Sequence, residues 1–150
     1  KGVVERQGTD LAIIALGSMV EAALKASDIL MAGGISAAVL NPRFVKPLDR
    51  DLIKSLAEST GKLIIVEEGI LAGGFGSAVL ELLADEGLTD VEVLRIGIPD
   101  EFVEHGTREE LLSDYGLTPE GIVMAAYNLK AGSGMMNFTF PGQGVGAIPH

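Results

Sequence analysis

The sequence predicts an α/β protein of three layers, in which an open, mostly parallel sheet carries helices on both faces. Two observations predict this fold class. Short apolar runs alternate with longer segments whose apolar residues recur at helical spacing, which is the pattern of strand–helix–strand units. The runs are apolar throughout, as is typical of strands that are covered on both faces. At 150 residues and 47% hydrophobic, the chain has room for one domain with its own core.

Five strands are expected along the chain. They are a short edge strand at Val3-Val4, then Leu11 to Leu16, Ile35 to Leu40, Leu63 to Val66 and Val91 to Ile96. The last strand alternates apolar and polar residues, which favours a position near the edge of the sheet.

Start and stop signals predict the helices between these strands. Ser18 is expected to cap the first helix, which ends at Gly33-Gly34. Asp49 is expected to cap the second, which ends at Gly61, and a glycine-rich turn from Gly69 to Gly76 leads into the third. The last two helices begin at a capping-box pair, Thr107 with Glu110, and at Thr118-Pro119.

Charge and composition exclude several function classes. A net charge of −10 argues against nucleic acid or an anionic membrane as the main partner, since both attract clustered positive charge. The absence of cysteine excludes disulfides and thiolate chemistry, and two histidines cannot alone build a multi-histidine metal site. The opening at Lys1 lacks the features of a signal peptide, so we expect a piece of a longer chain.

Ligands of open α/β sheets gather at the carboxyl ends of the strands. The turn at Gly17-Ser18 supplies one of the three glycines of a dinucleotide fingerprint, so a capped helix start is favoured over a phosphate cradle there. Glu67 and Glu68 would repel a phosphate near the following glycines. These carboxylates are expected to accept hydrogen bonds from helix N–H groups or from a facing subunit, with acid–base chemistry as a weaker alternative.

Two further candidates lie in loops. Arg43, in a connection with two prolines, can brace its loop through a salt bridge or hold a carboxylate or phosphate, and the brace is favoured. His105 can titrate near neutral pH, but it has no second catalytic partner nearby in sequence, so a structural role is favoured.

Several segments of the body resemble the C-terminal domain of the 1-deoxy-D-xylulose-5-phosphate synthases, thiamin diphosphate enzymes of the transketolase family. The strings that carry the resemblance run in family order and are Gly8 to Val20, Asn41 to Asp49, Val66 to Gly69, Gly73 to Val79 and Ile98 to Gly106. The resemblance implies a transketolase C-terminal-like domain over residues 1–130. It also implies a cytoplasmic homodimeric parent enzyme that joins pyruvate to glyceraldehyde 3-phosphate with loss of CO₂.

The same resemblance implies that catalysis happens elsewhere in that parent. Thiamin diphosphate and Mg²⁺ lie between two upstream domains of the family enzyme, and the Gly-Asp-Gly stretch that holds them does not occur in this sequence. We therefore expect no catalytic, cofactor-binding or metal residue here, and a role in packing against the upstream domains and in dimer formation. The candidate interface or loop-packing residues are Arg43, Glu67, Glu68, Gly73, Gly74, Phe75, Gly76, Ser77 and His105.

Residues 131–150 carry no Asp, Glu, Lys or Arg and depart from the family. Met136 to Gly144 resembles the opening strand and turn of the malonyl-CoA:acyl-carrier-protein transacylases, without the Gly-x-Ser-x-Gly nucleophile of that family. We expect a flexible or appended tail. For the body, two rival hypotheses stay open: a regulatory or partner-binding α/β domain of another transketolase-like or 2-oxo-acid dehydrogenase enzyme, and a small phosphate- or nucleotide-binding domain.

Overall fold

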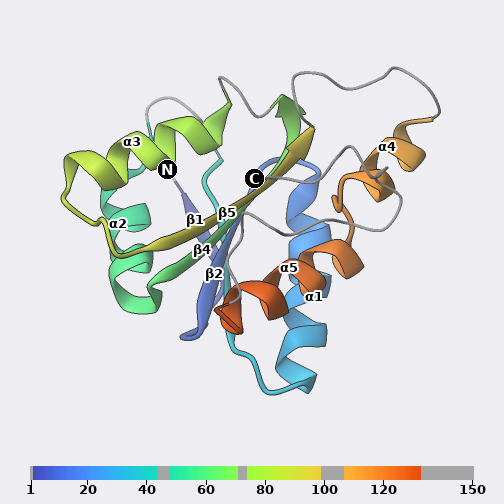
Figure 1. Cartoon of the computed structure of the whole chain (residues 1–150), viewed down its shortest axis with the longest axis horizontal. Coiled ribbons are helices and arrows are strands. Elements are labelled where there is room, and N and C mark those ends of the chain that lie inside the picture. Colours follow the sequence, from blue (N-terminus) through green and yellow to red (C-terminus); the bar gives the residue numbers. More distant parts are fainter. Residues whose placement is uncertain (1, 44–47, 71–73, 99–106, 133–150) are drawn as a thin grey trace.

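The computed structural model describes residues 2–43, 48–70, 74–98 and 107–132. These residues form one five-stranded sheet in the order β1-β3-β2-β4-β5, in which β1 runs antiparallel to β3 and the other pairs are parallel (Figure 1). The strands are β1 (Val3–Arg6), β2 (Leu11–Ala15), β3 (Ala37–Asn41), β4 (Lys62–Ile70) and β5 (Glu92–Ile98). The helices are α1 (Met19–Ala32), α2 (Arg50–Thr60), α3 (Phe75–Asp85), α4 (Arg108–Asp114) and α5 (Pro119–Lys130). The predicted α/β class is confirmed.

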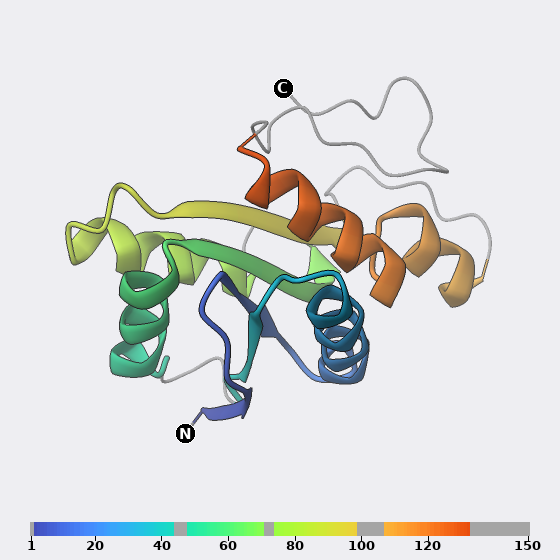
Figure 2. The same cartoon turned by 90° about the horizontal axis from the view of Figure 1, so that it is seen from below.

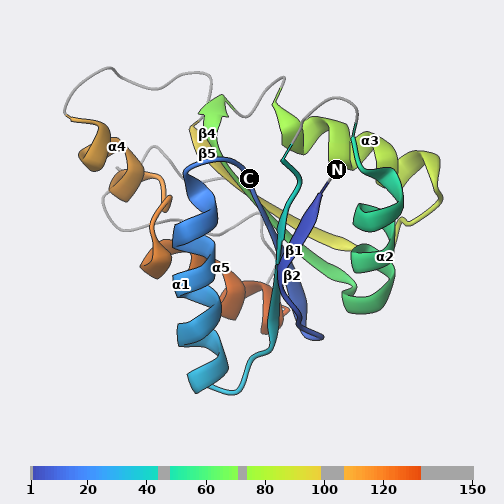
Figure 3. The same cartoon turned by 180° about the vertical axis from the view of Figure 1, so that it is seen from behind.

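The sheet separates two groups of helices. Seen from below, α2 and α3 lie on one side of the strands and α1, α4 and α5 on the other (Figure 2), and the view from behind shows the same division (Figure 3). Two apolar clusters fill the spaces between the layers, one under α1 and α5 and the other under α2 and α3.

Strand β2 shows how the sequence produces this arrangement. All five of its residues are buried, and they alternate between the two clusters: Ile13 packs under α1 and α5, and Ile14 under α2 and α3. Because successive side chains of a strand point to opposite faces, a strand covered on both faces must be apolar at every position. The continuous apolar run is therefore the signature of a central strand.

The expected strands are all present, but several of their bounds differ from the expectation. β1 and β5 each run two residues further than expected, to Arg6 and Ile98. Strand β3 begins at Ala37, two residues later than expected, because Ile35 and Ser36 donate their N–H groups to Leu30 and to the Asp10 carboxylate in the turn before it. Strand β4 runs four residues past Val66 to Ile70. Glu67 and Glu68, expected just after the strand, therefore belong to β4, and so do the first two residues of the turn expected from Gly69 to Gly76.

Most of the expected helix caps are present. Asp49 accepts a hydrogen bond from the N–H of Leu52, and Gly61 ends α2 in the left-handed conformation. The capping box of Thr107 is complete, and the Thr118 hydroxyl caps α5. Ser18 is the exception: it precedes α1, but its side chain makes no capping hydrogen bond.

None of the helices in the described part of the chain is long and apolar enough to span a membrane. Residues 133–150, which make up most of the expected tail, lie outside the described residues, so the domain boundary at residue 130 stays a prediction.

Candidate functional site

The turns that follow β2, β3 and β4 meet at one edge of the sheet, because these three strands run parallel. We call this edge the carboxyl edge and define it by residues 16–18, 41–43 and 67–70; it lies at the top of Figure 1. The sequence-predicted candidates that the structure describes lie at or beside it. Gly73 and His105 lie outside the described residues.

Glu67 is buried at the carboxyl edge, with 6% of its surface exposed. Its two carboxylate oxygens accept hydrogen bonds from the first two backbone N–H groups of α3, at 3.0 Å from Phe75 N and 2.9 Å from Gly76 N. The residue before α3, Gly74, has no side chain that can cap the helix. Glu67 therefore caps α3 from the neighbouring strand, which is the first of the two roles expected for it.

Glu68 has a different set of partners. Arg108, the first residue of α4, donates to both of its carboxylate oxygens, at 2.6 Å from Nε to Oε2 and 2.7 Å from Nη2 to Oε1. The Ser18 hydroxyl donates to Oε1 at 2.9 Å. The Arg108 guanidinium lowers the pKa of the Glu68 carboxyl, with a smaller contribution from Ser18, and Glu68 raises the pKa of Arg108.

Arg108 is a site residue that sequence reasoning missed. It lies directly after the capping residue Thr107, and forty residues separate it from Glu68. Nothing in the local pattern indicates that this arginine faces the end of β4. Ser18 does not cap α1 with its side chain, since its backbone is helical (φ −66°, ψ −12°) rather than extended, and its hydroxyl donates to Glu68 instead.

The residues that open α3 have packing roles in the structure. Phe75 is 2% exposed and belongs to the cluster under α2 and α3. Gly76 faces Arg95 of β5, and a Cβ added to it would lie 2.9 Å from the guanidinium carbon, closer than real Cβ contacts come. Ser77 is half-buried and donates its N–H to the carbonyl of Gly74. These positions favour loop packing over an exposed interface.

Arg43 is exposed and takes an unusual backbone conformation for a residue other than glycine, with φ of 68°. The Asn41 side chain holds this turn by accepting a hydrogen bond from the Arg43 N–H at 3.0 Å. The Arg43 side chain makes no ion pair with any residue that the structure describes. The favoured salt-bridge brace is therefore not formed among those residues.

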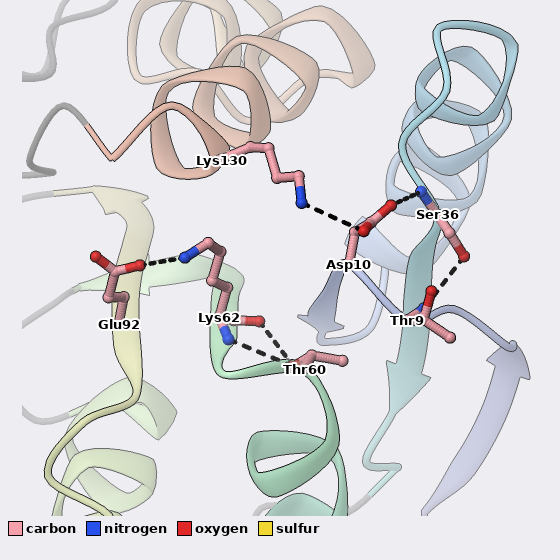
Figure 4. Close-up of polar contacts among 7 residues, drawn as sticks. All are labelled: Thr9, Asp10, Ser36, Thr60, Lys62, Glu92 and Lys130. Atoms are coloured by element: carbon pink, nitrogen blue, oxygen red, sulfur yellow. Dashed lines mark hydrogen bonds and ion pairs between the residues drawn. The ribbon is translucent and has the colours of Figure 1, made fainter.

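A second polar cluster lies at the opposite, amino edge of the sheet (Figure 4). Asp10 accepts a hydrogen bond from the Ser36 N–H at 2.7 Å and pairs with Lys130 at 3.3 Å. The Ser36 N–H, followed by Lys130, lowers the pKa of the Asp10 carboxyl. Lys62 pairs with Glu92 across β4 and β5. The Asp10 contacts join the starts of β2 and β3 to the end of α5, and the Lys62 contact joins the starts of β4 and β5. Each of these four charged groups has a partner, so we assign the cluster a structural role.

The carboxyl edge carries a shallow, open depression of about 300 Å³. Its lining residues are Leu16, Gly17, Ser18, Glu67, Glu68 and Gly69. A diphosphate placed there would meet two carboxylates, one committed to α3 and the other to Arg108, so the residues present do not fit thiamin diphosphate. No group of three His, Asp or Glu side chains suited to a metal ion occurs among the described residues.

The fold and this edge define an α/β domain with one antiparallel edge strand and an ion-paired carboxyl edge. A model of the family described as "Transketolase, C-terminal domain" matches residues 1–122, and the chain belongs to this family.

Its relatives within the family include 1-deoxy-D-xylulose-5-phosphate synthases. The chain is 57% identical over 122 residues to 1-deoxy-D-xylulose-5-phosphate synthase 1 of Geobacter metallireducens, covering 81% of this chain and 20% of that protein. It is 54% identical over 128 residues to the synthase of Syntrophotalea carbinolica, covering 85% and 20%. The chain thus spans about a fifth of the length of the curated relatives it matches.

A solved structure of a split-gene transketolase, described as an inactive β4 tetramer, shares the fold with a TM-score of 0.80 and 39% identity. The match covers 87% of this chain and 42% of the solved one.

Proposed function

We propose that this chain is the C-terminal domain of a 1-deoxy-D-xylulose-5-phosphate synthase, with a structural and dimer-forming role in that enzyme. The observation that carries the proposal is the 57% identity over 122 residues to the Geobacter metallireducens enzyme. Such a parent joins pyruvate to glyceraldehyde 3-phosphate with loss of CO₂, and its product feeds isoprenoid, thiamin and pyridoxal synthesis. The identity favours this function over that of an unrelated regulatory or nucleotide-binding domain.

The carboxyl edge supports a structural role within such an enzyme. Its two glutamates are held by Phe75, Gly76 and Arg108, so neither is an uncommitted acid or base. In the proposed parent, thiamin diphosphate and Mg²⁺ are bound by the upstream domains. The domain described here would contribute a rigid α/β body that packs against them, with its carboxyl edge turned toward the assembly.

The proposed parent is a cytoplasmic homodimer. The similarity to a split-gene transketolase that is described as a β4 tetramer supports the idea that domains of this type take part in subunit contacts. That protein is also described as inactive, which agrees with a domain that needs other parts of its enzyme for catalysis.

A domain exchange tests this function. Residues 1–122 replace the matching segment of the Geobacter metallireducens enzyme, and the rate of deoxyxylulose phosphate formation is measured with pyruvate and glyceraldehyde 3-phosphate. We expect the chimera to form dimers and to retain activity within about tenfold of the parent. A matched chimera with Gly76→Arg in the inserted residues is the control. Its large side chain should disturb the inserted domain, so it shows how the activity responds when that domain is misfolded. A folded, dimeric chimera without activity would contradict the proposal.

A further inference from the structure

Two consecutive glutamates at the end of β4 have their side chains on opposite faces of the sheet, where they bind different partners. Glu67 points to the side of α3 and is 6% exposed, whereas Glu68 points to the side of α1 and α4, where its side chain is 28% exposed. This division follows from the alternation of side chains along a strand. One carboxylate is therefore sealed in the fold, and the other ties two helices together at the surface.

Within the described part of the chain, helix α4 has few other attachments to the domain. None of its seven residues is buried. Leu112 and the following Tyr115 are half-buried where they pack against the cluster under α1 and α5. The first turn of α4 is held to the sheet by Arg108, whose guanidinium contacts Glu68 twice and the Ser18 hydroxyl at 3.4 Å.

We propose that Ser18, Glu68 and Arg108 form a latch that holds the first turn of α4 against the carboxyl edge and opens without unfolding the domain. The two parallel hydrogen bonds of the guanidinium fix the geometry of the closed state. The Arg108 side chain is 59% exposed, so water and salt compete for it and the pair contributes little to global stability. This contact therefore fixes the position of α4 and adds little to the free energy of unfolding of the domain.

The latch is a property of this chain and stands or falls separately from the proposed parent enzyme. It joins the ends of three elements that are distant in sequence: the start of α1, the end of β4 and the start of α4. Opening it would move the first turn of α4 away from the carboxyl edge and expose Ser18 and Glu68 to any partner that docks there. The shape of the carboxyl edge therefore differs between the closed and the open state of the latch.

Hydrogen exchange of the full 150-residue chain tests the proposal. In Arg108→Ala, we expect the amides of α4 to exchange up to about fivefold faster, while the melting temperature stays within about 4 °C of wild type. Glu68→Gln should give a similar effect, and the double variant no more than either single one, because all three changes open the same contact. Arg50→Ala, which removes an exposed arginine that pairs with Glu86 on the other side of the sheet, is the matched control and should leave α4 unchanged.

Salt gives an independent readout. Raising the ionic strength from about 0.05 M to about 1 M should speed exchange in α4 of the wild type and have little effect in Arg108→Ala, since screening weakens an exposed ion pair. Unchanged exchange of α4 in Arg108→Ala would overturn the latch. So would a loss of protection spread over the whole domain, because it would show that the contact supports global stability.

Discussion

Gly76 and Arg95 lie so close together that α3 has no room for a side chain at its second residue. A Cβ on Gly76 would lie 2.9 Å from both the Cζ and the Nη2 of Arg95, and closer still to the buried Nε. On its other side, the N–H of Gly76 donates to Glu67. The start of α3 thus lies between a carboxylate on β4 and a guanidinium on β5, and a side chain at Gly76 would have to displace one of its neighbours.

Gly76→Ala should therefore destabilise the domain. The methyl group must displace the Arg95 guanidinium or shift the start of α3, and we expect a loss of about 1–3 kcal/mol in the free energy of unfolding. Urea titration followed by circular dichroism measures this change. Gly69→Ala is the matched control, because the nearest atom to its added Cβ lies at an ordinary 3.8 Å, and its change should stay within about 1 kcal/mol. Equal losses in the two variants would show that the Arg95 contact is unimportant.

The adjacent glutamates of β4 should differ in their importance for stability. Glu67→Ala leaves two helix N–H groups without their buried acceptor, and we expect it to lower the free energy of unfolding by about 2 kcal/mol. Glu68→Ala removes a surface ion pair and should cost less than about 1 kcal/mol. Thermal unfolding of both variants in the same buffer gives the comparison. A larger loss for Glu68→Ala would contradict the assigned roles.

Asp49 is expected to stabilise α2 through its cap. One of its carboxylate oxygens accepts from the N–H of Leu52 and the other from the N–H of Gly2, at 3.4 Å and 3.0 Å. Asp49→Ala should lower the free energy of unfolding by about 1 kcal/mol. Asp51→Ala, on the exposed first turn of the same helix, removes a charge without removing the cap and serves as the control. If both variants lose the same stability, the helix dipole and not the cap is responsible.

Acid should weaken the domain through Glu68 and Asp10, each by a small amount, because both side chains are partly exposed. Both carboxyls have a pKa lowered by folding, Glu68 mainly through Arg108 and Asp10 mainly through the Ser36 N–H. A lowered pKa contributes stability above the unfolded value, near 4, and this contribution is lost as the pH falls through the folded value. We expect unfolding measured from pH 7 to pH 3 to show falling stability, with a shallower fall in Glu68→Gln and in Asp10→Asn. An unchanged slope in both variants would contradict these assignments.

The features that the sequence predicted are those that depend on residues close together in the chain. The apolar run of β2, the Asp49 cap and the capping box of Thr107 each depend on residues close together in the chain, so spacing alone reveals them. The latch could not be predicted in this way, because Glu68 is 50 residues from Ser18 and 40 from Arg108. Only the assembled sheet brings these three elements to one edge.

The extension of β4 was missed for a related reason. Two glutamates and a glycine have low strand propensity, and the glycine-rich sequence that follows favours a turn. In the structure, β5 still pairs with β4 at Ile70, and the bonds from Glu67 to α3 hold the end of the strand in place. Tertiary contacts here outweigh the local preference. Similarly, the Ser18 hydroxyl binds Glu68 rather than its own helix, because the end of β4 presents a charged acceptor next to it.

We propose that this chain is a scaffold and that its parent enzyme keeps the reactive machinery on other domains. Isothermal titration calorimetry of the purified 150-residue chain with thiamin diphosphate and Mg²⁺ tests it most directly, with the full-length Geobacter metallireducens enzyme as the positive control. We expect saturable heat for the full-length enzyme and none for this chain, at concentrations up to about 1 mM. Saturable binding of the cofactor to this chain, followed by release of CO₂ from pyruvate, would contradict it.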